Sequence, residues 1–196
     1  MSSPSWKNSL RETVRNLRTD LKMPGRWPRI AFVGVGQELR GDDAAGLLAV
    51  RRLAAELPPE PEGLLVLEAG PAPENVTGPL RRFGPDLVLF IDAAWLETAP
   101  GTIRLLDPDG ITGLGASTHT LPLSTVAAYL QAELGCRVAV LGVRPGDTAI
   151  GAPLSPPVAG AVEEIVRGLE EILADRSRRP PTTFQTGDSD AQTTLI

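Results

Sequence analysis

Short apolar runs alternate with segments of helical periodicity along the middle of the chain. The apolar runs are rich in Val, Ile and Leu and predict strands at residues 30–35, 64–67, 87–91, 102–106 and 137–143. The segments between and after them predict helices at residues 43–57, 74–83, 124–134 and 156–173. Strands that are apolar on both faces and alternate with helices are typical of a mostly parallel sheet covered on both sides. The pattern therefore predicts an α/β fold.

Local residue preferences place two of the helix starts. Ser124 is of a type that favours the N-cap position, so we expect it to cap the helix at 124–134. Pro156 and Pro157 suit the first turn of the last predicted helix, where a missing N–H costs nothing.

The two ends of the chain differ from its middle. Apolar residues recur every three or four positions from Trp6 to Leu21, which predicts an amphipathic helix within residues 1–27. This helix packs either on its own domain or on a partner, and the first alternative is favoured. Residues 175–196 are polar and contain few aliphatic side chains, so we expect a disordered tail. Residues 28–174 then form one domain that carries the chemistry.

Composition narrows the possible classes of function. A chain of 196 residues with 42% hydrophobic residues fits one domain with a true core. The net charge of −5 argues against a nucleic-acid partner, because such partners usually require a basic face. The single cysteine, Cys136, allows neither an intrachain disulfide nor a cysteine metal cluster, and it favours a cytoplasmic location. No apolar run approaches the ~20 residues of a membrane helix, and residues 1–20 lack a signal-peptide core.

A glycine-rich loop follows the first predicted strand and ends in two aspartates, Asp42 and Asp43. The glycine spacing matches neither the dinucleotide fingerprint nor a phosphate-binding loop. Ligands of parallel sheets bind beyond the carboxyl ends of the strands, which is where this loop lies. Asp42 and Asp43 either cap the following helix, a task that needs only one of them, or contribute to a site.

Two further polar residues are expected at the same edge of the sheet. Asp92 closes a strongly apolar strand, and burial of a carboxylate is costly unless it is paired or bound to a metal. His119 is the only histidine and precedes a predicted helix. In isolation, Asp92 would most often be structural and His119 solvated. Together with Asp43 they suit a divalent transition metal such as nickel or zinc, with coordination positions left open.

Four motifs in this order carry a resemblance to a known family. They are the glycine loop that ends in Gly-Asp-Asp, the segment GPAPEN at 70–75, FIDAA at 90–94 and STHTLPLS at 117–124. Over residues 29–173 the chain resembles the hydrogenase maturation endopeptidases, most of all the branch that processes formate-hydrogenlyase-type nickel–iron hydrogenase. The resemblance implies a three-layer α/β/α Rossmann-like domain with a mostly parallel twisted sheet. It also implies an activity, which is removal of the C-terminal extension of the large-subunit precursor after nickel insertion.

The resemblance also implies roles for individual residues. Asp43, Asp92 and His119 match the residues that contact the metal, and the two aspartates are the catalytic pair of an aspartic-type endopeptidase. The nickel belongs to the substrate and is its recognition element, so no tightly bound cofactor is expected in the free enzyme. Either the metal or a carboxylate could activate the water. Further substrate contacts are expected at Gly41, Glu68 and Thr118.

The hydrogenase large-subunit precursor is the expected partner, and the enzyme is expected to be a monomer without membrane insertion. The chain departs from the family pattern at Gln37, where Asn is usual, and at Glu68, where a shorter Asp is usual. The longer Glu68 side chain would change the shape of a substrate groove.

Three other interpretations remain open. The chain could be a non-enzymatic Rossmann-like module that binds a metal or a nucleotide. It could be a serine hydrolase that uses Ser117 or Ser124 with His119, although no GxSxG elbow is present. It could also be a peptidase of the same fold that acts on another precursor, because a fold does not determine a function.

Overall fold

The computed structural model describes residues 5–20, 26–59, 61–108 and 121–176. Within these residues, five strands form one sheet in the order β2-β1-β3-β5-β4. Their bounds are β1 Ile30–Val35, β2 Leu64–Gly70, β3 Leu87–Ala93, β4 Ile103–Leu106 and β5 Arg137–Val143. All neighbouring pairs are parallel except β4 and β5. The predicted mostly parallel α/β sheet is confirmed.

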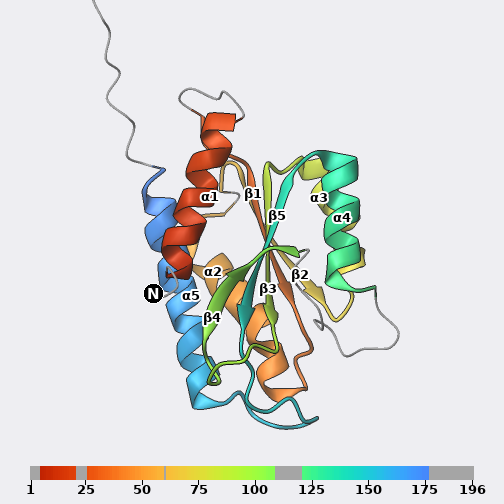
Figure 1. The fold of residues 1–196 in the computed structure, drawn as a ribbon, viewed down its shortest axis with the longest axis vertical. Coiled ribbons are helices and arrows are strands. Elements are labelled where there is room, and N and C mark those ends of the chain that lie inside the picture. Colours follow the sequence, from red (N-terminus) through yellow and green to blue (C-terminus); the bar gives the residue numbers. More distant parts are fainter. Residues whose placement is uncertain (1–4, 21–25, 60, 109–120, 177–196) are drawn as a thin grey trace, which may run out of the picture.

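The parallel strands start in register and therefore end at one edge. Ile30 at the start of β1 lies opposite Leu64 of β2 and Leu87 of β3, and Leu87 lies opposite Arg137 of β5. This shared carboxyl edge is the lower edge of the sheet in Figure 1. Strands β1 and β3 are almost completely buried, so only residues at or beyond their ends can meet a ligand.

Helices cover both faces of the sheet, which gives the three-layer α/β/α architecture (Figure 1). One face carries α1 Trp6–Asp20, α2 Ala45–Glu56 and α5 Pro156–Ala174. The other carries α3 Thr77–Phe83 and α4 Leu123–Leu134. Short 3-10 turns, η1 Gly41–Ala44 and η2 Pro73–Val76, precede α2 and α3. Among the described helices, none is long and apolar enough to cross a membrane.

The N-terminal helix α1 packs on its own domain, which confirms the favoured alternative. Its apolar stripe, which includes Trp6 and Leu10, is buried in the core cluster shared with α2 and α5. The Trp6 indole lies over Gly168 of α5, where a β-carbon would come within 2.5 Å of the ring. Trp6 Nε1 donates to Glu164 Oε1 at 3.0 Å, and Lys7 pairs with Glu171 at 3.2 Å. Of the tail predicted at residues 175–196, Asp175 is the C-cap of α5 and Arg176 is also described, whereas residues 177–196 lie outside the described residues.

Two local predictions are corrected by the structure. Ser124 is not the N-cap of α4, since the helix begins at Leu123 and Pro122 holds the cap position. The carbonyl of Pro122 accepts the first helical bonds, from Thr125 at 2.9 Å and Val126 at 3.2 Å. The segment expected to begin a helix at Asp43 starts instead as η1, and α2 follows from Ala45.

Candidate active site

Close backbone contact at Gly46 brings two candidate residues to the same place. A β-carbon at Gly46 would lie 2.1 Å from the Ile91 carbonyl oxygen and 2.4 Å from that of Val35. The first turn of α2 therefore sits directly on the ends of β1 and β3. As a result η1, which carries Asp43, contacts β3 where that strand ends in Asp92 and Ala93.

Asp43 is half-buried and held by the glycine loop. Its Oδ2 accepts a hydrogen bond from the backbone N–H of Gln37 at 2.8 Å. Gly36, with φ at 131°, makes this turn possible, because a β-carbon there would lie 1.9 Å from the Asp43 carbonyl oxygen. Burial raises the pKa of Asp43, while the Gln37 N–H and the charge of Arg40 oppose the rise.

Asp92 is one of the two buried polar or charged residues of the described chain, with 5% of its surface exposed. It lies opposite Gly142 of β5, one residue before the end of β3. Burial, together with the negative charge of Asp43, raises the pKa of Asp92 to about 7, and the N–H of Ala93 opposes the rise. Two carboxylates that disfavour each other's ionisation can share a proton or bind a cation. A perturbed pair of this kind is typical of a functional site.

Asp42, the other buried charged residue, has a different task from Asp43. Its Oδ2 accepts from the N–H groups of Gly146 at 2.7 Å and Asp147 at 3.0 Å. The N–H of Ser155 donates to Oδ1 at 2.7 Å, and the Ser155 hydroxyl donates to Oδ2 at 2.8 Å. Burial alone would raise the pKa of Asp42, but the N–H groups of Ser155, Asp147 and Gly146, with the Ser155 hydroxyl, lower it below its usual value. Asp42 thus fastens η1 to the loop before α5.

The capping interpretation of the two aspartates is therefore wrong. Arg40 holds the N-cap position of η1, and neither η1 nor α2 has a side-chain cap. Asp42 accepts hydrogen bonds from the loop before α5, whereas Asp43 lies at the carboxyl edge of the sheet, where it can contact a ligand.

Of the predicted metal ligands, the structure brings Asp43 and Asp92 together, and His119 lies outside the described residues, as does Thr118. The described part of the chain contains no cluster of three metal-ligating side chains. Asp43 and Asp92 supply carboxylate oxygens, which suit a divalent cation.

Two predicted substrate contacts, Gly41 and Glu68, lie beside this site. Gly41 is buried, and a β-carbon there would lie 2.6 Å from the Asp147 carbonyl oxygen. Glu68 is exposed near the end of β2. Arg51 of α2 forms ion pairs with Glu68, at 2.8 Å, and with Glu38, at 2.6 Å. Exposed ion pairs of this kind contribute little to stability, so a substrate could displace them at low cost.

Two exposed aliphatic residues at the carboxyl edge are not among the predicted site residues. Leu39 is 69% exposed in the glycine loop, and Ile150 is 81% exposed in the loop between β5 and α5. The N–H of Gly151 donates to the Leu39 carbonyl at 2.8 Å, so the two loops form one surface. For Leu39 the sequence did contain a sign of exposure, because this aliphatic residue lies between two charged residues, Glu38 and Arg40.

A family model described as hydrogenase maturation protease matches residues 48–172. The chain belongs to this family. It is 35% identical to the hydrogenase 3 maturation protease of Escherichia coli K12, over 69% of this chain and 85% of that protein. It is 31% identical to a putative hydrogenase maturation protease of Methanocaldococcus jannaschii, over 75% of this chain and 89% of that protein.

Solved structures of this family share the fold. The crystal structure of a NiFe hydrogenase maturation protease from Thermococcus kodakarensis superposes with a TM-score of 0.68 and 34% identity, over 75% of this chain and 93% of that one. The resemblance noted in the sequence is confirmed, and the protein is a hydrolase, a hydrogenase maturation endopeptidase. Membership of a protease family also argues against the non-enzymatic module. Helix α1 lies outside the matched residues 48–172.

Proposed function

We propose that this endopeptidase removes a C-terminal extension from a nickel–iron hydrogenase large-subunit precursor after nickel insertion. We propose further that it recognises the nickel that the precursor carries. The observation that carries the proposal is the pair of neighbouring carboxylates, Asp43 and buried Asp92: burial first, and then the negative charge of Asp43, raises the pKa of Asp92 to about 7. A divalent cation presented by the substrate would turn this repulsion into attraction.

Metal recognition of this kind makes nickel insertion a condition of tight binding. A precursor without nickel would meet two carboxylates that disfavour each other's charge, and a precursor with nickel would gain two anionic ligands. A protein can discriminate between two partners only by such a difference in binding free energy. His119 is the proposed third ligand, in its neutral imidazole form.

The same carboxylates suit aspartic-type hydrolysis. A carboxylate beside the attacking water can act as its general base. In this scheme an Asp43 or Asp92 oxygen takes a proton from water while the water oxygen attacks the scissile carbonyl. The carbon–nitrogen bond then breaks, and the proton passes to the leaving amine. The alternative is a water activated by the substrate's own metal. In known zinc enzymes, a metal-bound water has a pKa near 7.

We assign precursor docking to the surface formed by Leu39 and Ile150. Both side chains are exposed on loops that Asp42 and the Gly151 hydrogen bond hold in place. Such preformed apolar anchors bind a folded partner with little loss of conformational entropy. We also expect the enzyme to act as a cytoplasmic monomer, in keeping with one buried, free cysteine, Cys136.

One experiment separates nickel recognition from general peptidase activity. Purified precursor, with and without nickel, is incubated with the enzyme, and the cut is followed by intact mass. Only the nickel-loaded precursor should be processed. Asp43→Asn and Asp92→Asn should abolish the cut, and Glu170→Gln, at an exposed position on α5, should not. Equal processing of both precursors would instead favour a peptidase of this fold that does not read the metal.

A further inference from the structure

An exposed tryptophan, Trp95, lies beside the carboxylate pair. It directly follows the motif FIDAA and is three residues away from Asp92, so the Cα atoms of Trp95 and Asp92 lie within about 11 Å of each other. Trp95 is 59% exposed, whereas Trp6 is buried and Trp27 is half-buried. A large aromatic side chain therefore faces solvent at the same edge of the sheet as the proposed site.

Arg144 packs against Trp95 from the neighbouring strand. It directly follows β5, the strand next to β3. The guanidinium carbon of Arg144 lies 4.2 Å from the centre of the Trp95 ring. The backbone N–H of Arg144 donates to the Thr102 carbonyl at 2.9 Å, and its carbonyl accepts the N–H of Gly101 at 2.8 Å. Trp95 and Arg144 thus form a pair whose backbone is held in place by the loop between β3 and β4.

The positive charge of Arg144 is not matched by a carboxylate within the described ranges. None of the ion pairs there includes it. One of its Nη atoms donates to the backbone carbonyl of Pro145, and its buried Nε has no partner among the described residues. Burial and the charge of Asp43 raise the pKa of Asp92, and Arg144 does not offset this rise. Arg144 is therefore not the counter-ion of the aspartates.

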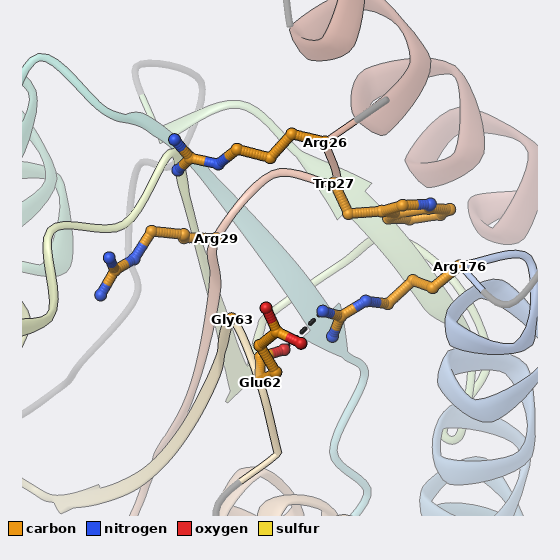
Figure 2. Close-up of a pocket in the computed structure, with 6 residues that line it drawn as sticks. All are labelled: Arg26, Trp27, Arg29, Glu62, Gly63 and Arg176. Atoms are coloured by element: carbon orange, nitrogen blue, oxygen red, sulfur yellow. Dashed lines mark hydrogen bonds between the residues drawn. The ribbon is translucent and has the colours of Figure 1, made fainter. Parts of the chain in front are cut away.

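A second group of arginines, at the opposite end of the sheet, does not form such a site. Arg26, Arg29 and Arg176 line a cavity of about 470 Å³ there. Figure 2 shows the guanidinium groups of Arg26 and Arg29 facing away from Arg176, beside which the Glu62 carboxylate lies. The Arg29 guanidinium lies instead 4.6 Å from the centre of the Phe83 ring. Because these groups do not converge on one anion, we assign no ligand to this cavity.

We propose that Trp95 and Arg144 bind the precursor beside the scissile bond, and that Arg144 pairs with an acidic side chain of the precursor. This inference rests on the proposed function. Tryptophan and arginine are enriched among the residues that contribute most to binding at protein interfaces. An arginine that lies over an aromatic ring keeps N–H groups at its edge, and a carboxylate can accept two of them at once.

The position of the pair identifies the partner. A precursor whose nickel meets Asp43 and Asp92 would place the polypeptide around its cleavage site within reach of Trp95, since Asp92 lies within about 11 Å. Recognition of nickel reports only that the metal is present. An additional ion pair with Arg144 would make the enzyme discriminate between precursors by their sequence.

Steady-state cleavage of nickel-loaded precursor, followed by intact mass, tests the proposal. Arg144→Gln and Trp95→Leu should each raise the KM at least about tenfold and leave kcat within about twofold, because a binding contact is lost and a transition-state contact is not. Arg144→Lys keeps the charge without the planar fork and should recover part of the loss. Arg137→Gln is the matched control, since Arg137 is exposed at the opposite end of β5, and it should behave as the wild type does.

Substitutions in the precursor identify the acidic partner. Each Asp or Glu near the cleavage site is replaced singly by Asn or Gln. One replacement should raise the KM of the wild-type enzyme at least about tenfold, and it should cause no further rise with Arg144→Gln, because the ion pair is already lost. The wild-type measurement stands even if an Arg144 variant folds poorly, which urea denaturation would reveal.

Three results would overturn the proposal. The first is a wild-type KM in both Arg144→Gln and Trp95→Leu, and the second is a precursor in which no acidic residue affects the KM. The third is an equal rise in KM for Arg137→Gln, which would show that overall charge governs binding. Failure of the proposed function looks different, because the wild-type enzyme would then leave nickel-loaded precursor uncut or would cut nickel-free precursor equally well.

Discussion

A β-carbon on Gly46 would lie 2.1 Å from the carbonyl oxygen of Ile91. This contact joins the first turn of α2 to the end of β3, and both ends of the contact are backbone. Since neither side can yield by a side-chain rotation, any residue larger than glycine must push α2 away from the sheet. The distance between Asp43 and Asp92 depends on the same contact.

Gly46→Ala should therefore damage both stability and activity. We expect a loss of at least about 1–3 kcal/mol in the free energy of unfolding, from overpacking, and a loss of cleavage greater than stability explains. Gly160→Ala is the matched control, since Gly160 lies in α5 and a β-carbon added there would have no atom within 4 Å. That control should be neutral or stabilise by up to about 1 kcal/mol. Urea denaturation measures both, and wild-type stability in Gly46→Ala would disprove the close contact.

Asp42→Asn should mainly lower stability and Asp43→Asn should mainly lower cleavage, although the two residues are adjacent and the substitutions identical. Asp42→Asn replaces an oxygen of a buried carboxylate that accepts bonds from Gly146 and Ser155, so we expect a loss of about 2–4 kcal/mol. Asp43→Asn removes a half-buried charge that repels Asp92, so stability should change by less than about 1 kcal/mol. Cleavage by Asp43→Asn should nevertheless fall at least about 100-fold. Comparable destabilisation by both would contradict the separate roles.

The sequence alone placed Asp43 and Asp92 at one edge, because the carboxyl ends of parallel strands meet there. Apart from the family resemblance, which pointed to Asp43, the residue pattern could not separate Asp42 from Asp43. Their difference depends on which side of a 3-10 turn faces the loop before α5, and that loop lies far along the chain. The helix cap predicted at Ser124 failed for a related reason, since a residue preference is weaker than the local geometry at Pro122.

The raised pKa of Asp92 predicts how stability depends on pH. The folded protein keeps this proton up to a pKa of about 7, whereas an unfolded aspartate loses it near 4. The folded state therefore binds more protons than the unfolded state between about pH 4 and 7, and stability falls as the pH rises through this window. Asp92→Asn lacks this penalty.

The measurement is the difference in unfolding free energy between Asp92→Asn and the wild type, by urea denaturation at pH 5 and pH 8. Asp92→Asn should gain stability relative to the wild type between these pH values, by about 2–3 kcal/mol. Contributions from groups that do not interact with Asp92 cancel in this difference. A gap that is the same at both pH values would mean that Asp92 ionises normally in the folded protein.

Leu39 and Ile150 should govern binding of the precursor but not the chemical step. Each side chain is largely exposed in the free enzyme, at 69% and 81%, so Leu39→Asp and Ile150→Asp should leave the unfolding free energy within about 0.5 kcal/mol of the wild type. Burial of a Leu or Ile side chain against a partner contributes about 1.5–3 kcal/mol, so the KM for nickel-loaded precursor should rise at least about tenfold, with kcat little changed.

Gln131→Asp adds the same charge at an exposed position near the far end of α4, and its KM should match that of the wild type. This control matters because the precursor must also approach an acidic enzyme, and a new negative charge anywhere could slow association. Equal changes in KM for Gln131→Asp and Leu39→Asp would show that charge, not the apolar contact, controls docking. A fall in kcat with unchanged KM would instead place Leu39 beside the scissile bond.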